Sequence, residues 1–154
     1  MKAKKRFGQN FLTDKKLLED LIGLINISTQ DKFLEIGPGK GDLTENLINF
    51  CDCYFGIEVD RDLLTFLKNK FPKNKKAFIS RDILKLNPSE IYPLNKFRVI
   101  GNIPYNISSP ILDWCEKNYE KILDVHFMLQ KEFALRCIGN EKSSSYGKLS
   151  VICN

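Results

Sequence analysis

The short segment Asn102-Ile103-Pro104-Tyr105 holds residue types that suit a reaction at the amino group of a planar base. Such an amine is a poor nucleophile, because its lone pair is delocalised into the aromatic ring. The side-chain oxygen of Asn102 and the carbonyl of Ile103 can accept its hydrogens and favour a pyramidal nitrogen. Pro104 stiffens the turn, and Tyr105 can stack on the base. The segment therefore predicts a base-gripping turn; a loop whose Pro-Tyr pair merely packs is the alternative.

A glycine-rich turn contains Gly37, Gly39 and Gly41, with Glu35 two positions before the first glycine. Glycine permits a positive φ and lets a ligand approach the backbone closely. The spacing Gly-x-Gly-x-Gly differs from the Gly-x-Gly-x-x-Gly of dinucleotide-binding proteins. It resembles the first motif of class I S-adenosylmethionine-dependent methyltransferases, which bind no pyrophosphate. A plain glycine turn is the alternative.

Further carboxylates follow the next predicted strands. Glu58 ends one strand, where a carboxylate can accept both hydroxyls of a ribose, although NAD-binding proteins share this feature. Asp82 follows the next strand and either accepts from an adenine amino group or caps a helix. Because Glu35, Glu58 and Asp82 all lie at strand ends, we expect them on one rim of the sheet.

Alternating strand and helix patterns predict the elements that position these residues. Strands are expected over 32–36, 54–58, 77–80, 97–101 and 125–129. Helices are expected over 17–25, behind a Thr13-Asp14 cap, and over 43–50. A third helix is expected to begin at an Asp60 cap and to run through 67, and a fourth to begin with Ser109 as cap and Pro110 in its first turn. The last is expected over 131–138. The alternation is typical of an α/β fold with a parallel, doubly wound sheet and helices on both faces. Ligands of such sheets bind at the carboxyl ends of the strands.

Composition indicates a soluble globular chain of one domain. The 154 residues are 43% hydrophobic and 28% charged. No apolar run approaches the roughly 20 residues that span a bilayer, and no signal peptide is evident. The five cysteines include no zinc-type pairs, because Cys51 and Cys53 have one residue between them. We therefore expect reduced thiols, no metal and a cytoplasmic location. The single histidine, His126, is expected to pack rather than to act as a base.

The net charge of +5 is dominated by lysine, with clusters at 2–6 and 68–76. Such clusters can contact a phosphate backbone. A solvated surface in a lysine-rich protein explains them equally well, so both interpretations stay open.

Several motifs together resemble the KsgA family of ribosomal RNA adenine dimethyltransferases. They occur in the family's order and cover essentially the whole chain: 6–12, 35–41, 58–60, 101–110, 127–132 and 146–151. The resemblance implies a class I, Rossmann-like fold and S-adenosylmethionine as methyl donor. It implies two successive methylations on each of two adjacent adenines near the 3′ end of small-subunit ribosomal RNA. It also implies that Gln9 and Asn10 contact the cofactor, with Leu12 and Gly37 lining its site.

Other functions remain as alternatives. The erythromycin-resistance methyltransferases of large-subunit RNA also carry Asn-Ile-Pro-Tyr, but Pro110 after Ser-Ser and the blocks 127–132 and 146–151 favour the small-subunit enzymes. A non-catalytic ribosome-assembly factor that binds RNA through its basic surface is a second class. A NAD-dependent reductase is disfavoured because the dinucleotide fingerprint is missing.

The chain also departs from the family. Members of the family continue beyond 146–151 with more strands, a second aromatic stacking motif and a small helical C-terminal domain. We therefore expect residues 1–154 to form a truncated catalytic domain whose fifth strand has an unpaired edge. Residues 149–153 have a strand pattern, whereas the family would begin a helix there. We expect weak cofactor binding and little activity from this chain alone, and a monomer acting on a pre-30S-type particle from the complete enzyme, without a membrane.

Overall fold

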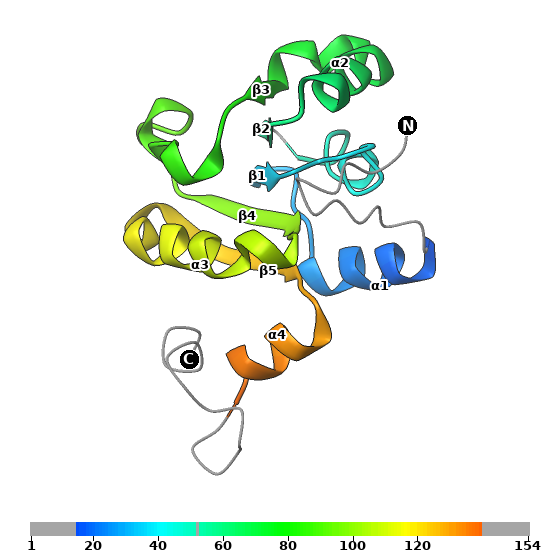
Figure 1. Ribbon diagram of the computed structural model, residues 1–154. Helices are drawn as coiled ribbons and strands as arrows, with labels where there is room; N and C mark the ends of the chain where they lie inside the picture. Colours follow the sequence, from blue (N-terminus) through cyan, green and yellow to red (C-terminus); the bar gives the residue numbers. More distant parts are fainter. Residues whose placement is uncertain (1–14, 52, 140–154) are drawn as a thin grey trace.

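The computed structural model describes residues 15–51 and 53–139, which form a parallel sheet of five strands. The strands are β1 (Lys32–Ile36), β2 (Cys53–Glu58), β3 (Phe78–Ser80), β4 (Phe97–Asn102) and β5 (Ile122–Met128). Their order across the sheet is β3-β2-β1-β4-β5 (Figure 1). Each predicted strand overlaps one of these, so the predicted parallel α/β sheet is confirmed.

Helices cover both faces of the sheet. They are α1 (Lys15–Ile25), α2 (Arg61–Lys70), α3 (Ser108–Lys117) and α4 (Lys131–Cys137). Helices α1 and α2 pack with Phe33 and Ile100 in one core, whereas α3 packs with Leu34 and Val99 in the other. Neighbouring residues of one strand thus point into opposite cores, as in a doubly wound sheet. Among the described residues, no helix is both long and apolar enough to cross a bilayer.

The predicted start of α2 is confirmed, and the predicted start of α3 is wrong by two residues. Asp60 caps α2, because its carboxylate accepts from the backbone N–H of Asp62 at 2.9 Å. Helix α3 begins at Ser108 behind Ile107, so Ser109 and Pro110 lie inside the first turn. The reason is local: a 3-10 turn over Tyr105–Ile107 runs directly into the helix and leaves no extended residue for a cap.

The helix predicted over 43–50 is also wrong. The segment contains only a 3-10 turn over Thr44–Asn46, followed by irregular turns. Its backbone bonds alternate between spacings of three and four residues, as in Asn46 N–H to Leu43 and Ile48 N–H to Thr44. The amide of Asn46 also bonds back to the carbonyl of Asp42, which competes with regular helix formation. Apolar spacing was therefore not enough to specify a helix in a segment that also contains the weak helix formers Thr44, Asn46 and Asn49.

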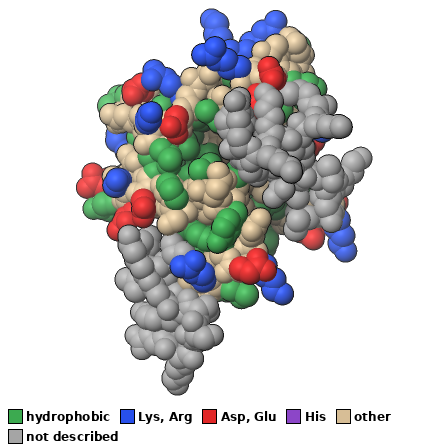
Figure 2. Space-filling model, viewed as in Figure 1, with side chains coloured by type: hydrophobic (Ala, Val, Ile, Leu, Met, Phe, Trp, Pro, Cys, Tyr) green, Lys and Arg blue, Asp and Glu red, His purple; other side chains and the backbone are tan. Residues whose placement is uncertain are grey.

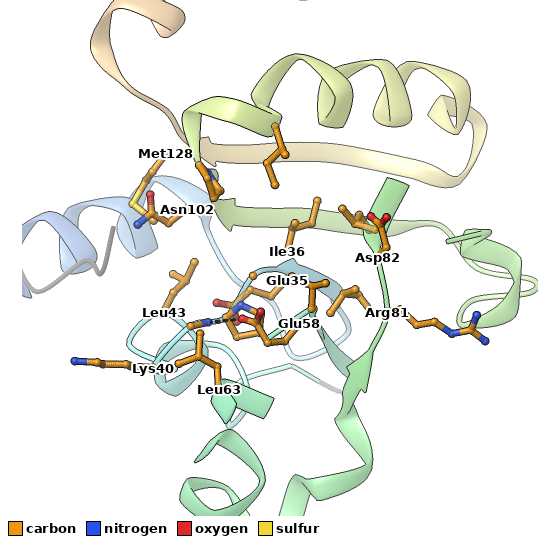
Figure 3. Close-up of a pocket in the computed structure, with 18 of the residues that line it drawn as sticks. Glu35, Ile36, Lys40, Leu43, Glu58, Leu63, Arg81, Asp82, Asn102 and Met128 are labelled. Atoms are coloured by element: carbon orange, nitrogen blue, oxygen red, sulfur yellow. Dashed lines mark hydrogen bonds between the residues drawn. The ribbon is translucent and has the colours of Figure 1, made fainter. Parts of the chain in front are cut away.

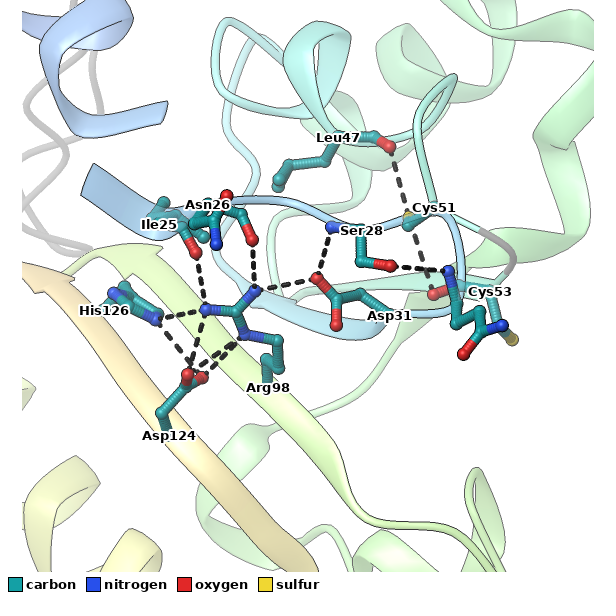
Figure 4. Close-up of polar contacts among 11 residues, drawn as sticks. Ile25, Asn26, Ser28, Asp31, Leu47, Cys51, Cys53, Arg98, Asp124 and His126 are labelled. Carbon is teal, nitrogen blue, oxygen red and sulfur yellow. Dashed lines mark hydrogen bonds and ion pairs between the residues drawn. The ribbon is translucent and has the colours of Figure 1, made fainter. Parts of the chain in front are cut away.

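Arg98 forms a buried polar network near the start of β4 (Figure 4). Its guanidinium pairs with Asp31 at 2.7 Å and Asp124 at 2.9 Å, and it donates to the Ile25 carbonyl at 2.7 Å. His126 of β5 lies 3.1 Å from the same guanidinium. The histidine thus belongs to a structural network at the end of β4 opposite its carboxyl end, as expected for a packed rather than a catalytic residue.

Strand β5 is an edge strand. Within the described part of the chain it pairs only with β4, and it carries exposed Leu123 and Val125. This agrees with the expected open edge beside the fifth strand. The predicted Thr13-Asp14 cap and the strand pattern of 149–153 lie outside the described residues.

Candidate active site

A cavity of about 300 Å³ opens at the carboxyl ends of the strands. It brings together side chains that are far apart in the sequence (Figure 3). Among the predicted site residues, those that line it are Glu35, Gly37, Gly39, Glu58, Asp82, Asn102 and Pro104. Five predicted cofactor residues therefore share one cavity with Asn102 and Pro104 of the predicted base-gripping turn, whereas Ile103 and Tyr105 do not line it. Gln9, Asn10 and Leu12 lie outside the described residues.

The glycine turn after β1 adopts a conformation that requires glycine. Gly37, Gly39 and Gly41 have φ values of 64°, 61° and 78°, which lie in the left-handed region. Gly41 does not line the cavity; a Cβ there would come within 2.7 Å of the Phe71 ring. The first glycines shape the cavity wall, and Gly41 allows the turn to pack on α2.

Glu58, the last residue of β2, holds a fixed carboxylate at the cavity. Its side-chain oxygens accept from the backbone N–H of Asp60 at 2.9 Å and of Gly39 at 3.3 Å. Burial raises the pKa of this carboxyl, while the backbone amides of Asp60, Gly39 and Val59 oppose the shift. The bond to Gly39 also ties the glycine turn to β2 (Figure 3). A carboxylate held in this way can accept further donors, such as a pair of ribose hydroxyls.

Glu35 lines the same cavity but is turned into the protein. Its Oε2 accepts from the Tyr54 hydroxyl at 2.6 Å and the Thr44 hydroxyl at 2.8 Å, and the residue is only 2% exposed. Burial raises the pKa of Glu35 to about 7. In this arrangement Glu35 supports the glycine turn, because it joins β1 to Tyr54 of β2 and to Thr44, which follows the turn in sequence. Sequence reasoning missed Thr44 and Tyr54, although a tyrosine hydroxyl in a buried strand predicts a buried partner.

Asp82 has the capping role that the sequence offered as one alternative, while its contact with an adenine amino group stays a prediction. Its Oδ1 accepts from the Leu84 N–H at 3.1 Å and caps a 3-10 turn over Ile83–Lys85. The residue also lines the cavity beside Ile83 and Leu84. A carboxylate between apolar side chains suits a flat ring that carries an amino group. Arg81 precedes it and points away from the cavity in Figure 3.

The base-gripping turn is held in place from two sides. Asn102 ends β4, and the next N–H, of Ile103, donates to the Met128 carbonyl of β5 at 3.0 Å. The Pro104 carbonyl accepts from the Ser108 hydroxyl at 3.0 Å. Ile103 is buried in the core, whereas the Tyr105 ring is 55% exposed. The turn thus presents an aromatic face while its backbone is fixed to β5 and α3.

Other cavity residues were not predicted. Met128 at the end of β5 and Asn106 after the turn both line it. The rule that ligands bind at strand ends could have identified Met128. Gly101, one residue before Asn102, was also missed: a Cβ there would come within 2.7 Å of the Ile36 carbonyl, so glycine permits β1 and β4 to approach closely beside the site.

Fold and cavity together are those of the class I, Rossmann-like methyltransferase fold: a parallel sheet with a glycine turn, carboxylates and an Asn-Ile-Pro-Tyr turn at its strand ends. The family described as Ribosomal RNA adenine dimethylase matches residues 1–154, and the chain belongs to this family. The resemblance drawn from the motifs is thereby confirmed.

Relatives and solved structures agree with this assignment. The Ribosomal RNA small subunit methyltransferase A of Methylobacillus flagellatus is 43% identical over 150 residues, which are 97% of this chain and 58% of that protein. The solved 23S rRNA methyltransferase ErmE is 29% identical, with a TM-score of 0.74 over 94% of this chain and 55% of its own. A dimethyladenosine transferase from Plasmodium falciparum is 27% identical, with a TM-score of 0.76 over 92% and 50%. The chain thus spans little more than half the length of these proteins.

Proposed function

We propose that the protein transfers methyl groups from S-adenosylmethionine to the amino nitrogen of adenines in small-subunit ribosomal RNA. The observation that carries this proposal is the shared cavity: Glu58 and Asp82 line it together with Asn102. A methyl donor and a methyl acceptor bound to these residues would meet inside this one cavity. Identity of 43% to a small-subunit methyltransferase over 97% of this chain favours the small subunit.

The residues present fit the cofactor. Glu58 would accept the ribose hydroxyls, Asp82 would accept the adenine amino group, and the turn at Gly37 and Gly39 leaves room for the amino-acid portion. When bound, S-adenosylmethionine supplies an electrophilic methyl group on a sulfonium. Glu35 contributes by bracing the turn, and Gln9, Asn10 and Leu12 stay predicted contacts.

Asn102 and Ile103 would prepare the adenine for attack. The Asn102 side-chain oxygen and the Ile103 carbonyl accept the hydrogens of the amine, so that the nitrogen lone pair turns away from the ring. Tyr105 stacks on the base and fixes its plane. A nitrogen–carbon bond then forms as the carbon–sulfur bond breaks, and the displaced proton passes to water. Positioning supplies most of the acceleration, so no strong general base is required.

The more detailed part of the proposal, which specifies the target adenines and the particle, follows from the family to which the chain belongs. We propose that the targets are two adjacent adenines near the 3′ end of the RNA, each methylated twice, in a pre-30S-type particle during ribosome biogenesis. We further propose a cytoplasmic protein that acts as a monomer in its complete form, with residues 1–154 as its catalytic domain. A non-catalytic RNA-binding role is the second candidate. It is favoured by the exposed Tyr105 ring, on which a base can stack without any methyl transfer.

Methyl incorporation into unmethylated small-subunit particles tests the proposal. With labelled S-adenosylmethionine, label should enter adenine N6 with the complete protein and be lost with its Asn102→Ala variant, whereas residues 1–154 alone should incorporate little. Binding of S-adenosylhomocysteine, measured by calorimetry, should largely survive in that variant. Equal incorporation by both proteins would remove Asn102 from its proposed role. Particle binding by the complete protein without incorporation would support the non-catalytic candidate.

A further inference from the structure

A long segment of the chain carries only positive charge. Between Leu63 and Arg81 the sequence contains six basic residues and no Asp or Glu. The segment comprises most of α2, a 3-10 helix over Pro72–Ala77 (η3) and β3. Sequence alone left open whether these charges serve a partner or only solvation.

Some of these charges are already neutralised. The Lys70 ammonium pairs with Glu45 at 2.7 Å, donates to the Lys40 carbonyl at 2.9 Å and lies over the Phe71 ring. Arg81 pairs with Glu90 at 3.6 Å. These contacts are structural, and they remove Lys70 and Arg81 from the charge that a partner would meet.

The remaining lysines form one surface, which we call the lysine surface: Lys68 of α2 and Lys73, Lys75 and Lys76 of η3. None of the four makes an ion pair with any residue that the structure describes. Lys73, Lys75 and Lys76 are exposed. Figure 2 shows Lys and Arg side chains gathered at the top of the molecule, over α2 and η3.

The lysine surface rests on a rigid base. Phe71, the residue before η3, stacks on Phe78 of β3 with ring centroids 5.6 Å apart. The same ring fills the space that Gly41 leaves open. The backbone that carries the lysines is therefore packed against the sheet, and a partner need not order it on binding.

The lysine surface also adjoins the cavity. Lys40, whose carbonyl binds Lys70, lines the cavity wall. Helix α2 starts beside Glu58 and its ten residues extend about 15 Å from there. A nucleic-acid strand whose base enters the cavity would reach this surface within a few nucleotides.

We propose that the lysine surface binds phosphates of the RNA that presents its adenine to the cavity. The inference rests on the proposed function and adds a docking surface outside the cavity. Four cations without an ion pair among the described residues, on a rigid base next to the site, complement a polyanionic strand. Sequence readout is not expected from them, because contacts to phosphates position a nucleic acid without identifying its bases.

The test compares two triple variants of the full chain. Lys73, Lys75 and Lys76 are changed to Gln in one, and the exposed Lys16, Lys96 and Lys117 in the other, so both lose the same net charge. Binding of a fluorescein-labelled RNA hairpin is followed by anisotropy over a series of salt concentrations. The slope of log K against log salt should become shallower by about 2 in the first variant, at about 0.7 for each lost phosphate contact. The slope should stay unchanged in the second variant.

The outcomes separate the inference from the function on which it rests. Equal slopes for the two variants, with RNA binding retained, would overturn the lysine surface and leave the proposed function standing. Absence of RNA binding by the unchanged chain would contradict the proposed function itself. Circular dichroism of both variants checks that neither loses its fold.

Discussion

The ring of Tyr105 stands perpendicular to the ring of Phe133, at an interplanar angle of 88° and a centroid distance of 6.4 Å. Tyr105 is 55% exposed and Phe133 of α4 only 4%. One ring is thus available to a partner while the other is locked in a small core with Leu112, Leu129 and Cys137. Phe133 of helix α4 therefore fixes the orientation of the Tyr105 ring, which the turn after β4 exposes.

Replacing Phe133 should weaken base stacking without affecting the cofactor. Phe133→Leu removes an edge-to-face contact of about 0.5–1.5 kcal/mol, so affinity for a single-stranded RNA that carries 2-aminopurine should fall about two- to tenfold. Fluorescence quenching of the 2-aminopurine measures stacking directly, and calorimetry with S-adenosylhomocysteine should show no change. Leu112→Ala, which loosens the same core without touching the Tyr105 ring, is the matched control. Equal loss of quenching in both variants would contradict the orienting role.

Gly41 should not tolerate a side chain. Its φ of 78° is unfavourable for other residues, and a Cβ would lie 2.7 Å from Phe71. We expect Gly41→Ala to lower the free energy of unfolding by about 2 kcal/mol or more. Gly23→Ala in α1, where nothing lies within 4 Å of the new Cβ, should instead stabilise by about 0.5–1 kcal/mol. Urea unfolding measures both changes, and a neutral Gly41→Ala would show that the glycine turn can rearrange.

Glu35 should make stability depend on pH. Because its folded pKa is raised from 4.5 to about 7, the folded state holds the proton more tightly than the unfolded state. The resulting stabilisation is fully present below pH 4.5 and is lost as the pH rises through about 7. Glu35→Gln keeps an oxygen acceptor for Tyr54 and Thr44 but cannot ionise.

Unfolding in urea at a series of pH values isolates this contribution. Relative to Glu35→Gln, the unchanged chain should lose about 3 kcal/mol of unfolding free energy across this pH interval. Glu116→Gln, which changes an exposed carboxyl, serves as the control. Parallel curves for the unchanged chain and Glu35→Gln would show that folding does not raise the pKa of Glu35.

The parts of the fold and of the site that could be predicted from the sequence are those that depend on a local pattern of residues. Short apolar runs located every strand, and the rule that ligands bind at strand ends placed Glu58, Asp82 and Asn102 on one rim. The buried state of Glu35 could not be read in this way, because its partners Thr44 and Tyr54 are brought to it only by the folded sheet.

Predictions from the sequence were wrong where local preferences for secondary structure compete with tertiary contacts. Apolar spacing over 43–50 predicted a helix, yet the Asn46 side chain there donates to the backbone carbonyl of Asp42. Ser109 has the right residue type for a cap, but the preceding turn over Tyr105–Ile107 already supplies helical backbone. The contact of Tyr105 with Phe133 spans two elements and leaves no trace in spacing.

The Arg98 network has a consequence for where the protein can deform. Its contacts join the end of α1, the residue before β1 and strand β5 at the amino ends of the central strands. Separating these elements would expose a guanidinium and two carboxylates without partners, at a high cost in free energy. Opening and closing around a nucleotide should therefore be confined to the loops at the carboxyl ends. Hydrogen exchange should reflect this gradient, with the amides of β4 slower than those of the glycine turn.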